Sequence, residues 1–112
     1  MVLAVEDVIA ERAFYVEGET QPALVFRLSR LYQTEGNYPY CRCEFITGTT
    51  SEQKEVDGLD GVDCIFRSLR VAGLIVEGLN ESVFGGKLRW QGSPEGGAGL
   101  GLPTLAVRFS PI

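Results

Sequence analysis

The sequence contains no histidine and no long hydrophobic run. Without histidine, neither a Ser-His-Asp triad nor a Cys-His pair can form, which removes two common routes to nucleophilic catalysis. A membrane-spanning helix needs ~20 consecutive apolar residues, and no segment supplies them. Residues 1–7 also lack the basic start and the apolar stretch of a secretory signal. These absences predict a cytoplasmic protein that is not an enzyme and has no membrane partner.

Basic residues are also in the minority, with 10 Lys and Arg against 15 Asp and Glu and a formal net charge of −5. Nucleic-acid binding needs clustered Lys and Arg to neutralise phosphates, so we expect no nucleic-acid partner. The 112 residues are 45% hydrophobic, which is too apolar for disorder and suits one domain. We predict a single domain over residues 1–112, with residues 1–8 as a flexible N-terminus.

Cysteine is scarce and its number is odd: the chain has Cys41, Cys43 and Cys64. Cys41 and Cys43 are two apart in a strand pattern, so their side chains share a face with Cα atoms roughly 6.6–7 Å apart, at the limit for a disulfide. Buried free thiols are the favoured interpretation. The alternatives are a Cys43–Cys64 redox pair or a three-thiolate metal site, which lacks the fourth ligand of structural zinc. We expect no metal and no cofactor.

Three segments in the first half of the chain have the alternation or the residue types of strands. Residues 9–17 are rich in β-branched and aromatic residues, and residues 23–32 alternate apolar with polar side chains. A turn over residues 17–22 joins them into a hairpin. Residues 40–47 alternate most cleanly, which predicts a half-buried antiparallel strand. Residues 48–60 are polar and acidic, with a short strand predicted over residues 54–56.

The apolar period then changes to three and four, which predicts a helix with one apolar face. This stripe consists of Val62, Ile65, Phe66, Leu69, Ala72, Gly73 and Val76. Asp60 is the expected N-cap of this helix, and Gly78 is its expected end. Gly73 lies on the stripe itself, where a close approach to the sheet would explain a residue that weakens helices.

The C-terminal part predicts two more strands, over residues 87–91 and 102–109. The glycine-rich residues 92–101 between them predict a flexible loop, because a phosphate loop would lead into a helix instead. The fold class is therefore α+β, an antiparallel sheet of about five strands with one long amphipathic helix packed on one face, in the order βββαββ. The other sheet face, with Arg27, Arg42, Glu44 and Arg89, is expected to be solvated or to meet a partner.

Two groups of side chains are candidates for binding a partner. The acidic run over residues 52–63 could attract a basic protein surface, although it is also typical of a solvated loop with a helix cap. Tyrosines near the 33–39 connection could anchor an interface or pack in the core. The candidate partner-binding residues are Glu55, Asp57, Asp60, Tyr32 and Tyr38.

Three short segments together resemble a family of small bacterial proteins of unknown function. They are Ile9-Ala10-Glu11-Arg12 in the first strand, the Cys43 strand that ends at Gly48, and Gly61-Val62-Asp63 at the helix start. The resemblance covers roughly residues 9–76, although members tend to carry Gln-Ala-Leu early in the helix where this chain has residues 65–69. It implies a bacterial, cytosolic origin and supplies no site.

These observations favour a small acidic protein-binding module with a basic protein partner, such as an immunity or antitoxin-type inhibitor or an adaptor. One alternative is a small-molecule-binding domain with Cys43, Cys64 and Tyr40 around a cleft between helix and sheet. The other is a structural homodimer formed through the open sheet face or an edge strand. A monomer and a homodimer are both compatible with the sequence.

Overall fold

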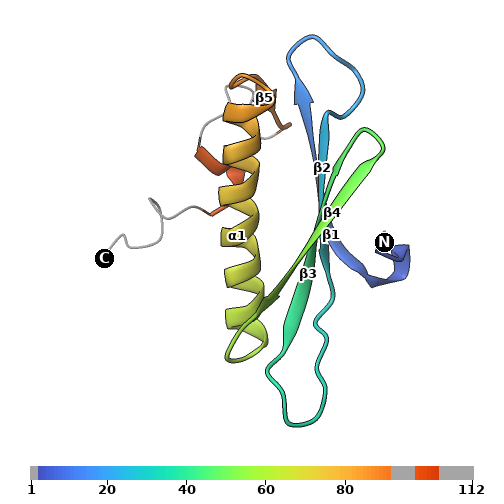
Figure 1. Cartoon of the computed structure of the whole chain (residues 1–112), viewed down its shortest axis with the longest axis vertical. Helices are drawn as coiled ribbons and strands as arrows, with labels where there is room; N and C mark the ends of the chain where they lie inside the picture. The colour runs from blue at the N-terminus through green and yellow to red at the C-terminus, as the bar shows by residue number, and fades with distance from the viewer. Residues whose placement is uncertain (1–2, 92–97, 104–112) are drawn as a thin grey trace.

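The computed structural model describes residues 3–91 and 98–103 (Figure 1). In chain order the elements are the 3₁₀ helix η1 (Val5–Asp7), β1 (Val8–Val16), β2 (Leu24–Ser29), β3 (Tyr40–Thr47), β4 (Thr50–Asp57), α1 (Gly61–Ser82), β5 (Leu88–Arg89) and the 3₁₀ helix η2 (Ala98–Gly101). The strands form one antiparallel sheet in the order β4-β3-β2-β1-β5. One long helix packs on this open sheet, so the predicted α+β fold is confirmed.

The core lies between α1 and the facing side of the sheet. Alternate residues of β2 and β3 point to this side and are buried, among them Phe26, Cys43 and Phe45. Phe26 and Phe45 are register partners whose rings stack with their centroids 5.5 Å apart. This alternation is the pattern that predicted both strands, and β3 has the predicted bounds.

The order of strands along the chain differs from the prediction. β4 is a full strand paired with β3 from Tyr40 to Thr47, so four strands precede α1 where three and a short segment were expected. The predicted strand over residues 102–109 lies outside the described residues from 104 onward, and Leu102 and Pro103 are in no strand. Within the predicted loop over residues 92–101, the last four residues form η2, whose Leu100 is buried in the core.

Helix α1 begins as predicted and ends later. The Asp60 carboxylate accepts a hydrogen bond from the Asp63 backbone N–H at 2.8 Å, which confirms the N-cap. Gly78 does not end the helix, because α1 continues to Ser82 and the chain turns only at Gly85 and Gly86, whose φ angles are 60° and 79°. A glycine ends a helix through a left-handed conformation, and the structure places that conformation at the later pair.

The face that α1 buries is narrower than the predicted stripe. Its buried residues are Cys64, Ser68, Ala72, Gly73 and Val76. Val62 is 80% exposed and Phe66 is 46% exposed, so the prediction that both cover the sheet is wrong. Gly73 does make a close approach, but to Pro103 and Leu102 after η2 and not to the sheet. Part of the apolar surface of α1 is thus left uncovered within the described part of the chain.

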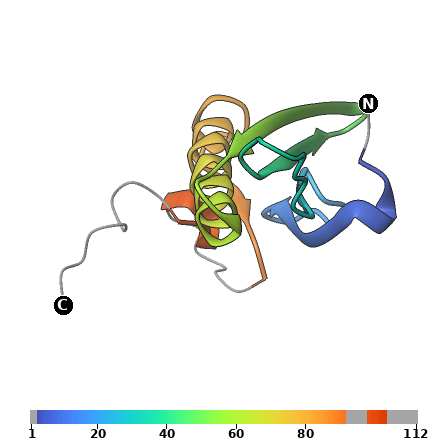
Figure 2. The same cartoon turned by 90° about the horizontal axis from the view of Figure 1, so that it is seen from below.

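The N-terminal segment lies across the sheet from α1, as both views show (Figures 1 and 2). Leu3 is buried, and its backbone N–H donates to Oε2 of Glu44 at 3.2 Å. The Ser51 hydroxyl donates to the same oxygen at 2.7 Å. Leu3 is therefore packed against the sheet, and the flexible N-terminus over residues 1–8 stays a prediction. Glu44 is fully buried, with Arg27 at 3.8 Å, so the expectation that it is solvated or meets a partner is wrong. Among the described residues, no helix is long and apolar enough to cross a membrane.

Candidate functional site

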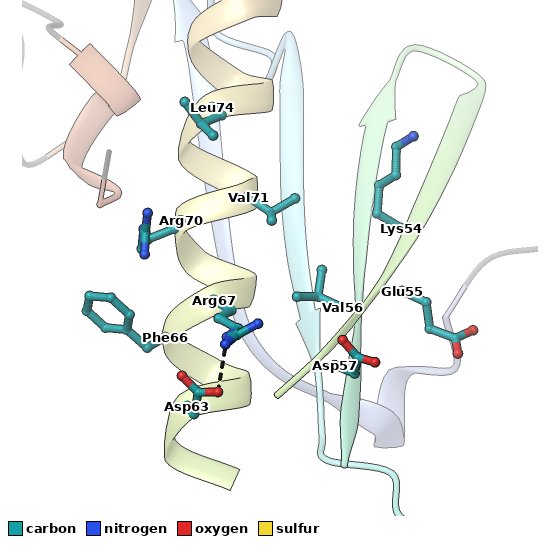
Figure 3. Close-up of a pocket in the computed structure, with 10 residues that line it drawn as sticks. All are labelled: Lys54, Glu55, Val56, Asp57, Asp63, Phe66, Arg67, Arg70, Val71 and Leu74. Carbon is teal, nitrogen blue, oxygen red and sulfur yellow. Dashed lines mark ion pairs between the residues drawn. The ribbon is translucent and has the colours of Figure 1, made fainter. Parts of the chain in front are cut away.

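A groove runs between α1 and β4, the strand at one edge of the sheet (Figure 3). Its volume is about 610 Å³. Four consecutive residues of β4 and six residues from three turns of α1 line it: Lys54, Glu55, Val56, Asp57, Asp63, Phe66, Arg67, Arg70, Val71 and Leu74. The groove therefore combines a strand edge, which lies in the run that the sequence marks as acidic, with the surface of the segment predicted as an amphipathic helix.

The inner part of the groove is apolar and its outer rim is charged. Val71 reaches from α1 toward the β4 side, where Val56 lies, while Phe66 and Arg70 project from the far side of the helix (Figure 3). Leu74 is 43% exposed and Phe66 is 46% exposed, and Leu74 follows Phe66 by two helical turns. Apolar side chains left at the surface beside a concave region are typical of a binding groove.

The charges of the groove balance, with Lys54, Arg67 and Arg70 against Glu55, Asp57 and Asp63. Asp63 is engaged internally: it accepts from the Leu59 backbone N–H at 2.8 Å and pairs with Arg67 at 3.0 Å. The hydrogen bond from Leu59, followed by Arg67, lowers the pKa of Asp63 below its ordinary value. The acidic run over residues 52–63 therefore does not make the groove acidic.

Two cations of the groove have no counter-ion among the described residues. Lys54 on β4 is exposed, and Arg70 on α1 lies over the Phe66 ring at 5.8 Å. The Nε atom of Arg70 is buried without a hydrogen-bond partner in the described part of the chain. A buried donor without a partner costs free energy.

The outer edge of β4 also carries backbone groups that point away from the sheet. Tyr40 exchanges both backbone hydrogen bonds with Tyr32, at 2.8 and 2.9 Å, so its N–H and C=O point toward the β2 side. Successive residues of a strand direct their N–H and C=O groups to opposite neighbours. The N–H and C=O groups of Cys41 therefore point toward β4, where Cys41 pairs with Val56. The N–H and C=O groups of Glu55 and Asp57 consequently point outward along the edge.

The candidate residues from the sequence do not form one surface. Glu55 and Asp57 line the groove, with Glu55 also 3.9 Å from Arg42. Asp60 is engaged as the N-cap of α1. Tyr38 is 63% exposed in the loop after β2, as an interface residue would be.

Tyr32 belongs to a separate cluster on the sheet face away from α1. Its ring stacks on that of Tyr40 with centroids 5.2 Å apart. The Arg30 guanidinium lies 4.1 Å from the Tyr32 ring centroid, and that of Arg42 lies 5.2 Å from it. These contacts hold Tyr32 against its neighbours, away from the groove.

The three cysteines are buried and free, in agreement with the favoured interpretation. The sulfur atoms of Cys41 and Cys64 are 3.6 Å apart, whereas the alternative interpretation paired Cys43 with Cys64. Burial raises the pKa of Cys43 to about 12 and that of Cys64 to about 11, so both are protonated near neutral pH. Within the described residues, no cluster of three metal-ligating side chains occurs.

The proposed cleft of Cys43, Cys64 and Tyr40 is not formed, because Tyr40 faces the opposite side of the sheet from Cys41 and Cys43. The groove instead involves residues that the sequence did not single out: Lys54, Arg67, Arg70, Val71 and Leu74. These residues carry no distinctive sequence pattern, because they become neighbours only where α1 lies beside the edge strand β4.

Comparison with known proteins finds no matching family model, no matching curated protein and no matching solved structure. The resemblance to small bacterial proteins of unknown function stays a prediction.

Proposed function

We propose that the chain is a protein-binding module that takes up an extended segment of a partner as an additional strand along β4. The observation that carries this proposal is the position of a full-length edge strand directly beside an apolar groove on α1. Strand addition uses both features, because the edge supplies main-chain hydrogen bonds and the groove accepts alternate side chains.

The two edges of the sheet differ in what they offer. β5 spans only Leu88–Arg89 and pairs with the end of β1, so it presents little backbone to an added strand. β4 spans Thr50–Asp57 and pairs with β3 along its whole length. Proteins commonly keep edge strands short to prevent unwanted pairing, which makes the long β4 edge the favoured docking position.

The groove also indicates the composition of the partner segment. Side chains that point toward α1 would contact Val56, Val71 and Leu74, which favours apolar residues at those positions. Lys54 favours a carboxylate near the rim. This mixed chemistry fits an apolar and acidic strand better than the basic surface expected from the acidic run.

The test selects random extended peptides against the wild-type chain from a display library. Glu55→Pro removes an outward backbone N–H and leaves the pairing with β3 in place, since proline is tolerated on an edge strand. Glu55→Gln is its matched control, because it loses the same charge and keeps the N–H. We expect Glu55→Pro to weaken peptide binding by about tenfold or more and Glu55→Gln to change it by less than about threefold.

A second pair of variants tests the helix side of the groove. Leu74→Lys places a charge in the groove, whereas Val83→Lys places one beyond the end of α1 at a residue that is 62% exposed. Only the first is expected to reduce binding. The proposal fails if no peptide is selected, or if the selected peptides bind the Glu55→Pro and Leu74→Lys variants as tightly as the wild type.

A further inference from the structure

We infer that the strand taken up along β4 is β4 of a second copy of this chain, paired antiparallel about a two-fold axis normal to the sheet. This inference rests on the proposed function and names its partner: Glu52 of the second copy would supply the carboxylate beside Lys54, while Thr50 and not an apolar residue would lie opposite Val56. Such a dimer joins two five-stranded sheets into one continuous sheet, with both α1 helices on the same face.

Symmetry limits the registers that two β4 strands can adopt. The axis keeps each side chain on its own face of the sheet, so residues on the helix side must oppose residues on the helix side. Lys54 and Glu52 share that side, because their partners on β3 are the buried Cys43 and Phe45. The allowed registers therefore differ from one another in steps of two residues.

Charge then selects among these registers. When residues 50–56 of the two copies overlap, Lys54 of each copy lies opposite Glu52 of the other, which gives two attractive pairs. When residues 51–57 overlap, Lys54 faces Lys54. The shorter overlaps on either side place Glu52 against Glu52 or Glu55 against Glu55. Like charges directly opposite are destabilising, so one register is favoured and its neighbours are penalised.

The backbone is compatible with the same register. Glu55 of one copy lies opposite Ser51 of the other, and alternation along β4 points the N–H and C=O groups of both residues outward. The two residues can exchange main-chain hydrogen bonds across the interface. The charged side chains of β4 thus allow pairing in one register, where a fully apolar edge would allow many.

The test measures the mass of the protein by light scattering and sedimentation over a range of concentrations. Lys54→Glu and Glu52→Lys each convert both attractive pairs into repulsive ones, and both residues are exposed, so the fold should be unaffected. We expect each single reversal to weaken the dimer by about tenfold or more. The double variant Lys54→Glu/Glu52→Lys recreates the attraction and should return the dimer Kd to within about threefold of the wild-type value.

Two results would overturn the inference. A wild-type chain that stays monomeric up to about 1 mM excludes self-association, because a dissociation constant above that concentration is weaker than that of typical specific contacts. A dimer that tolerates both single reversals, or that the double reversal does not restore, excludes this pairing of β4. Neither result bears on peptide binding by the monomer, which the Glu55→Pro and Glu55→Gln pair decides separately.

Discussion

Two glycines on α1, Gly73 and Gly78, allow the contact between the helix and the segment after η2 to be measured directly. Both lie inside the helix with ordinary helical backbone, and they differ in surroundings. A Cβ atom on Gly73 would collide with the carbonyl oxygen of Pro103, whereas one on Gly78 would meet no atom within 4 Å. The Gly→Ala pair therefore separates helix propensity from packing.

Alanine is favoured over glycine in a helix interior by about 1 kcal/mol, and this gain applies at both positions. At Gly78 nothing opposes it, so Gly78→Ala should raise the free energy of unfolding by about 1 kcal/mol. At Gly73 the collision is with backbone, and overpacking of this kind costs about 3 kcal/mol. Gly73→Ala should therefore lower the free energy of unfolding by about 2 kcal/mol.

The measurement is urea unfolding of the wild type and both variants, followed by circular dichroism. The predicted difference between the variants is about 3 kcal/mol, which is well above the error of the extrapolation. If Gly73→Ala is stabilised as much as Gly78→Ala, the helix does not pack against Pro103 and the placement of η2 is wrong.

Three further outcomes follow from the contacts described above. Cys43 stays protonated to about pH 12 in the folded chain and loses its proton from about pH 9 when the chain is unfolded. The free energy of unfolding should therefore fall with rising pH across this window, by up to about 1.4 kcal/mol per pH unit. Urea unfolding of Cys43→Ala at several pH values should show a flatter dependence, and an unchanged slope would contradict the burial of this thiol. Asp60→Ala should lower the free energy of unfolding by about 1 kcal/mol while Asp60→Asn keeps the cap, so equal losses in thermal unfolding would argue against the hydrogen bond to Asp63. Native-state reaction with a thiol reagent should be slow for the buried cysteines, and rapid labelling would show that α1 separates readily from β3.

The strands and the helix were predictable where one face is buried and the other is not. Residues 40–47 alternate strictly, and β3 has those bounds. β4 gave almost no signal, because Thr50–Asp57 lies at the sheet edge and none of its side chains is fully buried. A strand without a buried face carries no apolar period, so only residues 54–56 suggested it.

The helix illustrates a second limit of sequence patterns. Val62 and Phe66 extend the apolar stripe, and periodicity assigns them to the core because it cannot show how wide a surface the sheet covers. Gly78 resembles a helix end, yet the later glycines at 85 and 86 take the left-handed conformation. Contacts with residues far away in the sequence determine both the width of the buried helix face and the position of the helix end.

The candidate site was predictable only in part. Glu55 and Asp57 were chosen for their charge, and they do line the groove. Arg70 and Leu74 were not foreseen, because their importance arises from the position of α1 beside β4. No local pattern encodes that relation, which depends on the sheet order and on the point where the helix crosses it.

Whether β4 takes up an added strand along its outer edge can be measured by residue-resolved amide hydrogen exchange. The chain is compared at a dilution where it is monomeric and with its edge occupied, either at high concentration or by a selected peptide. The amide of Glu55 should become protected on occupation, while that of Val56, already paired with Cys41, is slow in both states. Association that leaves the Glu55 amide exchanging as fast as in the monomer would show that the added strand does not pair with this edge.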